Sequence, residues 1–202
     1  MEIIAISRGK ALPLLALQGS DSEQSARSVL SGIRKKAIST RDQPYAVQIH
    51  ALGIEGDEQA DLSVHGGLDK AIYAYPSEHY PVWQTLRLQA LKRDELLEPG
   101  FLGENLTIAG LLENEVWVGD VLVFAGGEVR LRVTSSRSPC YKFNTVMGFK
   151  QAALMMNQSG YTGFYLEVIQ QGRLRAGERF ELAPGDRYMR IDELHRMNQR
   201  KR

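Results

Sequence analysis

The chain has 202 residues, of which 43% are hydrophobic and 24% are charged, and its 25 Lys and Arg residues nearly balance its 24 Asp and Glu residues. A chain of this length can bury a core without cross-links. A net charge of +1 provides no surplus of cations for sequence-independent binding of nucleic acid. The single cysteine, Cys140, excludes an intramolecular disulfide, a zinc site made of several cysteines and an iron–sulfur cluster held by this chain alone.

The first residues do not resemble a targeting segment. Residues 1–6 are short and apolar, include Glu2, and lack both a basic leader and a small-residue cleavage site. The sequence contains no run of about 18 uncharged apolar residues that would cross a bilayer. We therefore expect a soluble, cytoplasmic protein that binds neither membranes nor nucleic acid.

Short segments of alternating apolar and polar residues dominate the chain, and this period predicts half-buried strands. In chain order, these segments are 2–7, 45–52, 114–118, 120–124, 128–135, 165–170 and 179–182. Glycine-containing turns separate them. Many short strands at close spacing favour a barrel or a sandwich over a doubly wound sheet.

Two stretches predict helices. In 77–97, large apolar side chains recur at helical spacing, with Ser77 as a candidate N-cap and Pro81 in the first turn. Residues 144–158 predict a second helix, which the following Ser159-Gly160 pair would close.

Two further stretches stand apart from this pattern. Residues 18–44 are rich in Ser, Gln, Arg and Lys, which predicts a polar loop or an irregular insertion. Residues 185–202 are basic and form either a solvated tail or a short amphipathic helix built on Met189, Leu194 and Met197.

Cys140 lies in a loop that directly follows the predicted strand 128–135. Arg137 and Lys142 flank it, and Pro139 stiffens the backbone just before it. Neighbouring cations favour a thiolate, which would be a nucleophile or a metal ligand. The alternative is that Cys140 is a small buried hydrophobe in the core.

Three glycine-containing segments are further candidates for a binding site. Residues 64–71 place a Gly-Gly pair between His65 and Lys70, an arrangement that suits an anion but is also common in plain turns. Residues 103–107 open another extended stretch, and Asn105 in it offers both donors and acceptors to a heterocycle. Residues 53–57 are the third segment, and each of the three is also compatible with turn chemistry alone.

Several common catalytic motifs are missing from the sequence. It has no dinucleotide fingerprint, P-loop, zincin motif or nucleophile elbow. A cysteine nucleophile paired with His50, His65 or His79 remains open, because such partners need only be close in space.

Taken together, six segments resemble the MOSC domain family, named for the C-terminal domain of molybdenum cofactor sulfurase, and within it the stand-alone bacterial YiiM-like proteins. In the order of the family they are G-I-E-G-D (53–57), V-H-G-G-L-D-K-A (64–71), Y-P-S-E-H-Y (75–80), F-L-G-E-N-L (101–106), V-G-D-V (118–121) and R-S-P-C-Y-K (137–142). The resemblance implies a mainly β protein in which residues 1–184 form a single MOSC-type β-barrel domain with a few peripheral helices.

The resemblance also implies a cofactor and its site. Molybdenum cofactor would bind with Cys140 as the protein's thiolate ligand to molybdenum, and a soft thiolate suits this metal. The cofactor-binding residues that the resemblance implies are His65, Gly66, Gly67, Lys70, Glu104, Asn105, Arg137, Ser138 and Lys142.

The activity implied by the resemblance is reduction of small N-hydroxylated compounds, such as 6-hydroxylaminopurine, to amines by oxygen-atom transfer. Electrons would come from a separate flavin or iron–sulfur reductase, and a homodimer is compatible with the resemblance. A carrier of the cofactor or a sulfur-transfer accessory without turnover is the alternative. A hydrolase with Cys140 as its nucleophile is a third class.

Overall fold

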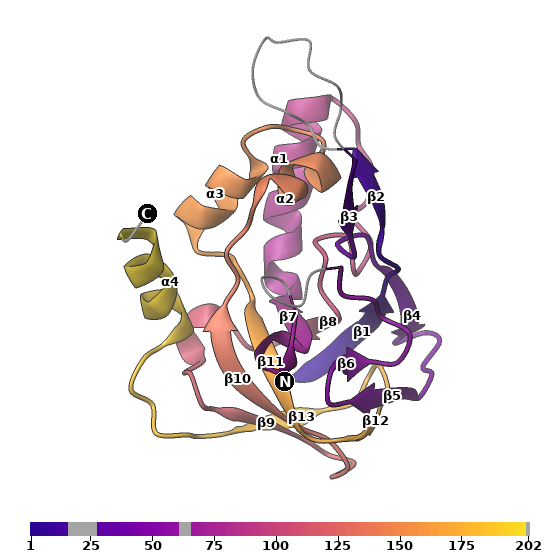
Figure 1. Ribbon diagram of the computed structural model, residues 1–202, viewed down its shortest axis with the longest axis vertical. Coiled ribbons are helices and arrows are strands. Elements are labelled where there is room, and N and C mark those ends of the chain that lie inside the picture. Colours follow the sequence, from indigo (N-terminus) through magenta and orange to yellow (C-terminus); the bar gives the residue numbers. More distant parts are fainter. Residues whose placement is uncertain (16–27, 61–65, 201–202) are drawn as a thin grey trace.

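The computed structural model describes residues 1–15, 28–60 and 66–200. Its main sheet has eight strands in the order β13-β9-β10-β11-β7-β8-β1-β4, antiparallel except for the parallel pair β7 and β8 (Figure 1). These strands are β1 (Glu2–Arg8), β4 (Lys36–Thr40), β7 (Ile72–Pro76), β8 (Leu106–Ala109), β9 (Val121–Phe124), β10 (Arg130–Ser136), β11 (Phe164–Gln170) and β13 (Phe180–Ala183). A mainly β fold with a few helices is therefore confirmed.

Two smaller sheets accompany the main one. The first is three-stranded, with β5 (Val47–His50) between β12 (Gly172–Leu174) and β6 (Gly53–Ile54). The second is the hairpin of β2 (Leu12–Leu15) and β3 (Ser28–Ser31). The strand pairs of the main sheet run in one line from β13 to β4, so closure into a barrel stays a prediction.

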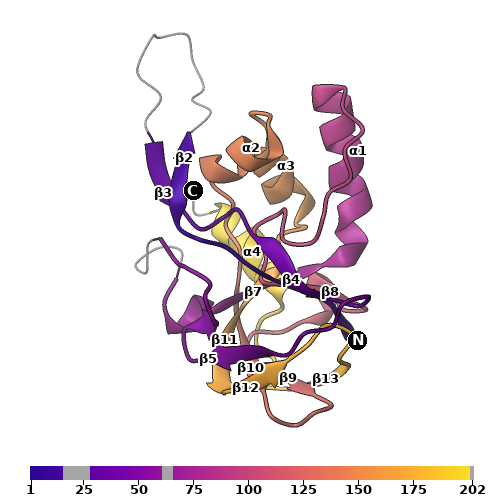
Figure 2. The ribbon, with the colours of Figure 1, turned by 90° about the vertical axis from the view of Figure 1, so that its right-hand side faces the viewer.

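Three helices gather beyond one end of the main sheet and one packs beside it (Figures 1 and 2). The helices are α1 (Tyr80–Leu91), α2 (Tyr141–Met147), α3 (Ala152–Ser159) and α4 (Ile191–Arg200), and the short 3₁₀ turns are η1 (Leu68–Lys70), η2 (Ser77–His79) and η3 (Glu113–Glu115). A second core cluster, which includes Tyr75, Trp83 and Phe143, packs α1, α2 and α3 against β7. This cluster fixes the start of α2, next to Cys140.

The predicted helices form with shifted bounds. The first ends at Leu91, because Lys92 adopts a left-handed conformation with φ of 57°. The predicted helix 144–158 is two helices, since Gly148 turns the chain with φ of 83° between them. The predicted end at the Ser159-Gly160 pair is confirmed, and Gly160 has φ of 74°.

The predicted strand 114–118 is wrong, because its first two residues belong to the 3₁₀ turn η3, whose first residue, Glu113, is buried. Glu113 Oε1 accepts a hydrogen bond from Gly163 N (2.7 Å). This buried polar contact, and not an alternation of apolar side chains, therefore sets the backbone here.

The described part of the expected loop 18–44 differs from the prediction, because it contains β3 and β4. The sequence suggests a loop because serines occupy inward positions. Ser39, on β4, is buried and its Oγ accepts hydrogen bonds from Tyr45 N (2.9 Å) and Ala176 N (3.0 Å). Residues 18–27 of this prediction lie outside the described residues.

Near the C-terminal end, residues 191–200 form the helix α4 rather than a solvated tail. The buried face of this helix differs from the predicted face of Met189, Leu194 and Met197. Ile191 and His195 are buried, and His195 Nε2 lies 2.9 Å from Asn157 O, whereas Met197 is 36% exposed. Over the part of the chain that the structure describes, no helix is both long and apolar enough to cross a membrane.

Candidate functional site

A cavity of about 100 Å³ opens where the loop after β10 meets β7, β11 and the loops that precede β4 and β8. Segments far apart in the sequence contribute to its wall. The lining residues are Ser31, Gly32, Ile33, Lys35, Asp57, Glu58, Gln59, Ala60, Lys70, Tyr73, Gly103, Asn105, Arg137, Ser138, Cys140, Lys142 and Tyr165.

Cys140 lies at the start of α2, directly after the buried Pro139. Its backbone is extended, and its carbonyl accepts a hydrogen bond from Phe143 N (2.9 Å) in the first turn of the helix. Cys140 is only partly buried, and it contributes to the cavity wall. Of the two alternatives for Cys140, a small hydrophobe sealed in the core therefore does not describe it.

Arg137 is a buried cation in the same wall, with 7% of its surface exposed. Its Nη1 donates hydrogen bonds to Tyr73 Oη (3.1 Å) and Leu102 O (2.7 Å), and its guanidinium lies over the Tyr73 ring at 4.7 Å. Burial works against this charge, but the side chains of Tyr73, Tyr165 and Cys140 raise the pKa of the guanidinium above its ordinary value. The wall around Cys140 thus carries a permanent positive charge.

Tyr73 and Tyr165 form the floor between β7 and β11, where they are directly paired across the two strands. Their rings lie 5.3 Å apart, and Lys70 Nζ is 6.0 Å from the centroid of the Tyr165 ring. Burial raises the pKa of both phenols, although Arg137 opposes this shift. Both hydroxyl groups therefore remain neutral in the ordinary pH range.

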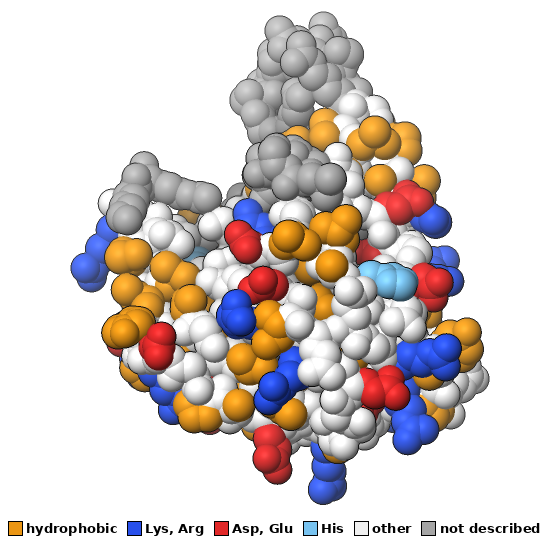
Figure 3. All heavy atoms as spheres, turned by 60° about the horizontal axis from the view of Figure 1, so that its bottom comes forward, with side chains coloured by type: hydrophobic (Ala, Val, Ile, Leu, Met, Phe, Trp, Pro, Cys, Tyr) orange, Lys and Arg blue, Asp and Glu red, His pale blue; other side chains and the backbone are white. Residues whose placement is uncertain are grey.

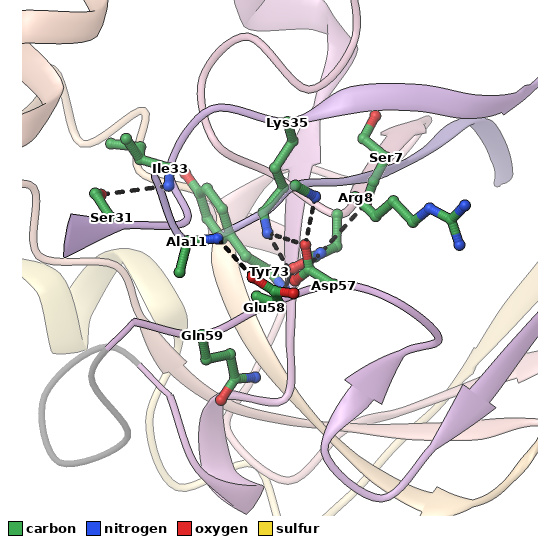
Figure 4. Close-up of polar contacts among 12 residues, drawn as sticks. Ser7, Arg8, Ala11, Ser31, Ile33, Lys35, Asp57, Glu58, Gln59 and Tyr73 are labelled. Carbon is green, nitrogen blue, oxygen red and sulfur yellow. Dashed lines mark hydrogen bonds and ion pairs between the residues drawn. The ribbon is translucent and has the colours of Figure 1, made fainter. Parts of the chain in front are cut away.

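Lys35 and Asp57 form a buried ion pair on another side of the cavity, where Lys35 extends over the carboxylate (Figure 4). Lys35 Nζ lies 2.5 Å and 2.7 Å from the two carboxylate oxygens, and the side chains are only 8% and 5% exposed. Asp57 also accepts hydrogen bonds from Gly9 N (2.7 Å) and Asn105 Nδ2 (2.9 Å). Burial lowers the pKa of Lys35, and Asp57 opposes this shift.

Asn105 ties this pair to the sheet. Its Oδ1 accepts a hydrogen bond from Tyr73 N (3.1 Å), and its Nδ2 donates to Ser7 O (3.3 Å) as well as to Asp57. The amide is 4% exposed, so its first role is to hold β7, β1 and Asp57 in place around the cavity.

Six of the expected site residues line this one cavity: Lys70, Asn105, Arg137, Ser138, Cys140 and Lys142. Gly66 and Gly67 are described but do not line it, and Gly67 N instead donates to Gln59 Oε1 (3.0 Å). His65 lies outside the described residues.

Glu104 lies behind the wall rather than in it. It is fully buried, and its Oε1 accepts hydrogen bonds from Gly100 N (2.7 Å), Thr107 Oγ1 (2.8 Å) and the Tyr80 hydroxyl. Burial raises the pKa of this carboxyl, and these hydrogen bonds oppose the shift. Glu104 therefore supports the loop before β8.

No histidine lines the cavity with Cys140 among the described residues. His79 is buried elsewhere, where its Nε2 lies 2.8 Å from Glu113 Oε2 and its ring stacks on Tyr161. His50 is exposed on β5. The geometry therefore gives no support to the cysteine hydrolase hypothesis within the described part of the chain.

The model of the MOSC domain matches residues 61–181, which is more than half of the chain. The chain belongs to the MOSC domain family. Membership associates it with molybdenum cofactor, in agreement with the resemblance seen in the sequence.

Known proteins of this kind include an uncharacterized protein of Bacillus subtilis (strain 168), YflK, which is 37% identical over 177 residues that cover 87% of this chain and 74% of YflK. A protein of Gibberella moniliformis named "Reductase" is 30% identical over 156 residues, which cover 77% of this chain but 27% of that protein. Among solved structures, YiiM from Geobacillus stearothermophilus superimposes with a TM-score of 0.70 and 27% identity, covering 99% of this chain and 84% of that one.

The donor set of the cavity fits molybdenum cofactor. Cys140 offers one sulfur, the soft donor that such a metal prefers, and Lys70, Arg137 and Lys142 surround it with charge that suits an anionic cofactor. The described residues contain no group of three or more His, Cys, Asp or Glu side chains that converge as a metal site. A single thiol suits a metal that arrives with ligands of its own.

Proposed function

We propose that the chain is a molybdenum-cofactor-dependent reductase that converts small N-hydroxylated compounds, such as 6-hydroxylaminopurine, into amines, with Cys140 as the protein ligand of molybdenum. One observation carries the proposal: a partly buried thiol lines a cavity whose wall is rich in cations. The reductase name of the Gibberella moniliformis relative supports a redox role.

When bound, the cofactor would supply the two-electron oxygen-atom transfer that this reaction requires. Reduction of R–NHOH to R–NH₂ and water also takes up two protons. The residues of the chain bind the anionic cofactor, position the substrate and provide protons.

Cationic side chains in the cavity wall would bind the anionic cofactor. Lys70 and Lys142 line the cavity, and the buried Arg137 adds a cation that does not titrate in the ordinary pH range. Because these groups lie in partly water-excluded surroundings, their attraction for an anion is stronger than it would be at an open surface.

Lys35 is the residue of this cavity best placed to deliver a proton. Its ammonium group is held against Asp57, and Asp57 is in turn fixed by Gly9 N and Asn105 Nδ2. Burial lowers the pKa of Lys35, which makes the ammonium group a better acid than an exposed lysine. Lys35 would thus donate one of the two protons to the leaving oxygen and then regain a proton from solvent, which would also supply the second proton.

The metal-ligand assignment is tested by molybdenum content. Protein purified from cells that synthesise the cofactor should contain molybdenum, and Cys140→Ser should reduce the content to background because the sulfur ligand is lost. Tyr141→Phe changes the exposed neighbouring residue and should leave the metal content unchanged. Equal molybdenum in wild type and Cys140→Ser would contradict the assignment.

Turnover is tested with the loaded wild-type protein and reduced methyl viologen as electron donor. Conversion of 6-hydroxylaminopurine to adenine, followed by chromatography, is the expected result. Metal-loaded protein that reduces no N-hydroxylated substrate would instead be a carrier or an accessory. Hydrolytic activity in metal-free protein, together with covalent labelling of Cys140, would indicate a hydrolase.

A further inference from the structure

A second hollow, of about 700 Å³, shares Lys35 with the cavity. The end of β1, the start of β2, the loop before β4 and the helices α1 and α2 border it. Six cationic residues line it, and we call it the basic groove: Arg8, Lys10, Arg34, Lys35, Lys36 and Arg87. Lys35 also lines the cavity described above, so the groove and the proposed reaction site meet at this residue.

Half of these cations have acidic partners. Lys10 pairs with Glu58 (2.6 Å), Arg87 pairs with Glu95 (2.7 Å), and Lys35 pairs with Asp57.

The other half carry unbalanced charge. The Arg8 guanidinium donates to the Glu55 carbonyl (3.0 Å), and no acidic partner is found for Arg8, Arg34 or Lys36 among the described residues. The whole chain has a net charge of only +1, and basic and acidic side chains lie interspersed on the face seen in Figure 3. The basic groove therefore contains three cations whose charge no described acidic side chain offsets.

Apolar side chains lie among these cations. Leu12 is 58% exposed, and the Arg87 guanidinium lies over the Phe101 ring, 5.2 Å from the ring centroid. Ile38 and Val146 complete the apolar part of the lining. An apolar centre among charged groups is typical of a protein interface, whereas a site for a small anion needs no exposed leucine.

We propose that the basic groove docks the acidic surface of a separate electron-donor protein. This inference rests on the proposed function, because each reduction of R–NHOH consumes two electrons, which would leave the reduced flavin or iron–sulfur centre of that donor. Redox partners form small, transient interfaces, and complementary charge accelerates their encounter more than it tightens the complex. Docking in the basic groove would place the donor beside Lys35, which also lines the cavity.

A pair of matched variants tests the groove. Arg34→Glu with Lys36→Glu reverses two exposed charges in the basic groove, and Arg173→Glu with Arg175→Glu reverses two exposed charges at and just after β12. None of the four residues forms an ion pair with a described residue, and both double variants change the net charge equally.

Association rates of cofactor-free protein with two acidic redox proteins, a flavodoxin and a [2Fe–2S] ferredoxin, are measured at rising NaCl. The Arg34→Glu, Lys36→Glu variant should associate at least about tenfold more slowly at low salt and lose most of the salt dependence. The Arg173→Glu, Arg175→Glu variant should stay within about twofold of wild type. Equal rates in the two double variants, or no association of wild type with either protein, would overturn the proposal.

Other occupants give different results. If the groove variant keeps donor association but loses binding of inorganic phosphate or of anionic phosphatidylserine vesicles, the groove binds a small anion or a lipid and the proposal is wrong. If the variant changes only the oligomeric state in gel filtration, the occupant is a second copy, and the proposal is again wrong.

Turnover separates this inference from the proposed function. Loss of activity with flavodoxin but not with reduced methyl viologen in the groove variant would support docking. Loaded wild type that binds the donor yet reduces no substrate with either reductant would contradict the reductase assignment and leave the docking result standing.

Discussion

Burial acts differently on the two ionisable side chains nearest the loop before β8. Arg137 keeps its charge, because phenol and carbonyl oxygens surround its guanidinium and its pKa is raised. Glu104 receives three hydrogen bonds at Oε1, while its Oε2 is buried without a partner. Burial outweighs these donors and raises the pKa of the carboxyl, because protonation removes a negative charge from a buried site.

This shift predicts how stability depends on pH. The unfolded Glu104 carboxyl ionises near its ordinary pKa of 4.5, and the folded one ionises at higher pH. Between the two values the folded state binds more protons, so the contribution of Glu104 to stability falls as pH rises above about 4.5. Glu104→Gln cannot ionise, so its free energy of unfolding should improve relative to wild type as pH rises.

Urea unfolding of both proteins at a series of pH values measures this difference. Glu98→Gln, an exposed carboxyl of the same region, controls for the change in net charge. A difference between Glu104→Gln and wild type that is constant or shrinks with pH would show that the buried carboxyl does not titrate as described.

At the scale of elements, alternation of apolar and polar residues in the sequence predicts six of the strands and misses the rest. It predicts β1, β5, β9, β10, β11 and β13. The alternation does not reveal β7, because all five of its residues are buried and a strand covered on both faces has no period of two.

Some residues of the candidate site are likewise predictable from the sequence, and others are not. The loop around Cys140 is predictable because cations flank a lone cysteine in adjacent positions of the chain. Tyr73 and Tyr165 meet only through the register of β7 and β11, and Lys35 comes from a stretch that predicts a loop. Contacts between residues this far apart carry no local signal in one sequence.

Gly163, which directly precedes β11, predicts a strong element-scale effect. Its φ is 62°, and a Cβ there would lie 2.4 Å from the Ala74 carbonyl oxygen of β7. Gly163→Ala should therefore lower the free energy of unfolding by about 3 kcal/mol, from backbone strain and a clash that β7 cannot relieve.

Gly160→Ala is the matched control three residues earlier. Gly160 also has a positive φ, of 74°, but a Cβ there meets nothing within 4 Å. Gly160→Ala should therefore lower the free energy of unfolding by only about 1 kcal/mol, from backbone strain alone. Urea denaturation measures both losses, and equal values would mean that the close approach of Gly163 to β7 does not matter for stability.

At the scale of the whole molecule, the cavity depends on the complete fold. Its lining residues range from Ser31 to Tyr165, and they come from the loop before β4, the segment after β6, both partners of the β7–β11 pair and the start of α2. The basic groove shares Lys35 with this cavity. A ligand in the cavity would therefore contact segments that come together only in the folded chain.

This organisation predicts that the cofactor stabilises the fold. A ligand that binds only the folded state adds about 2.7 kcal/mol when its free concentration is about 100 times its Kd. Wild type purified from cells that make molybdenum cofactor should thus melt at a higher temperature in scanning calorimetry than wild type from cells that cannot make it. Cys140→Ser should abolish most of that difference because the metal loses its protein ligand, whereas Tyr141→Phe should preserve it. Equal melting temperatures in two wild-type preparations that differ in molybdenum content would place the metal outside the folded cavity. That result would contradict the site described around Cys140.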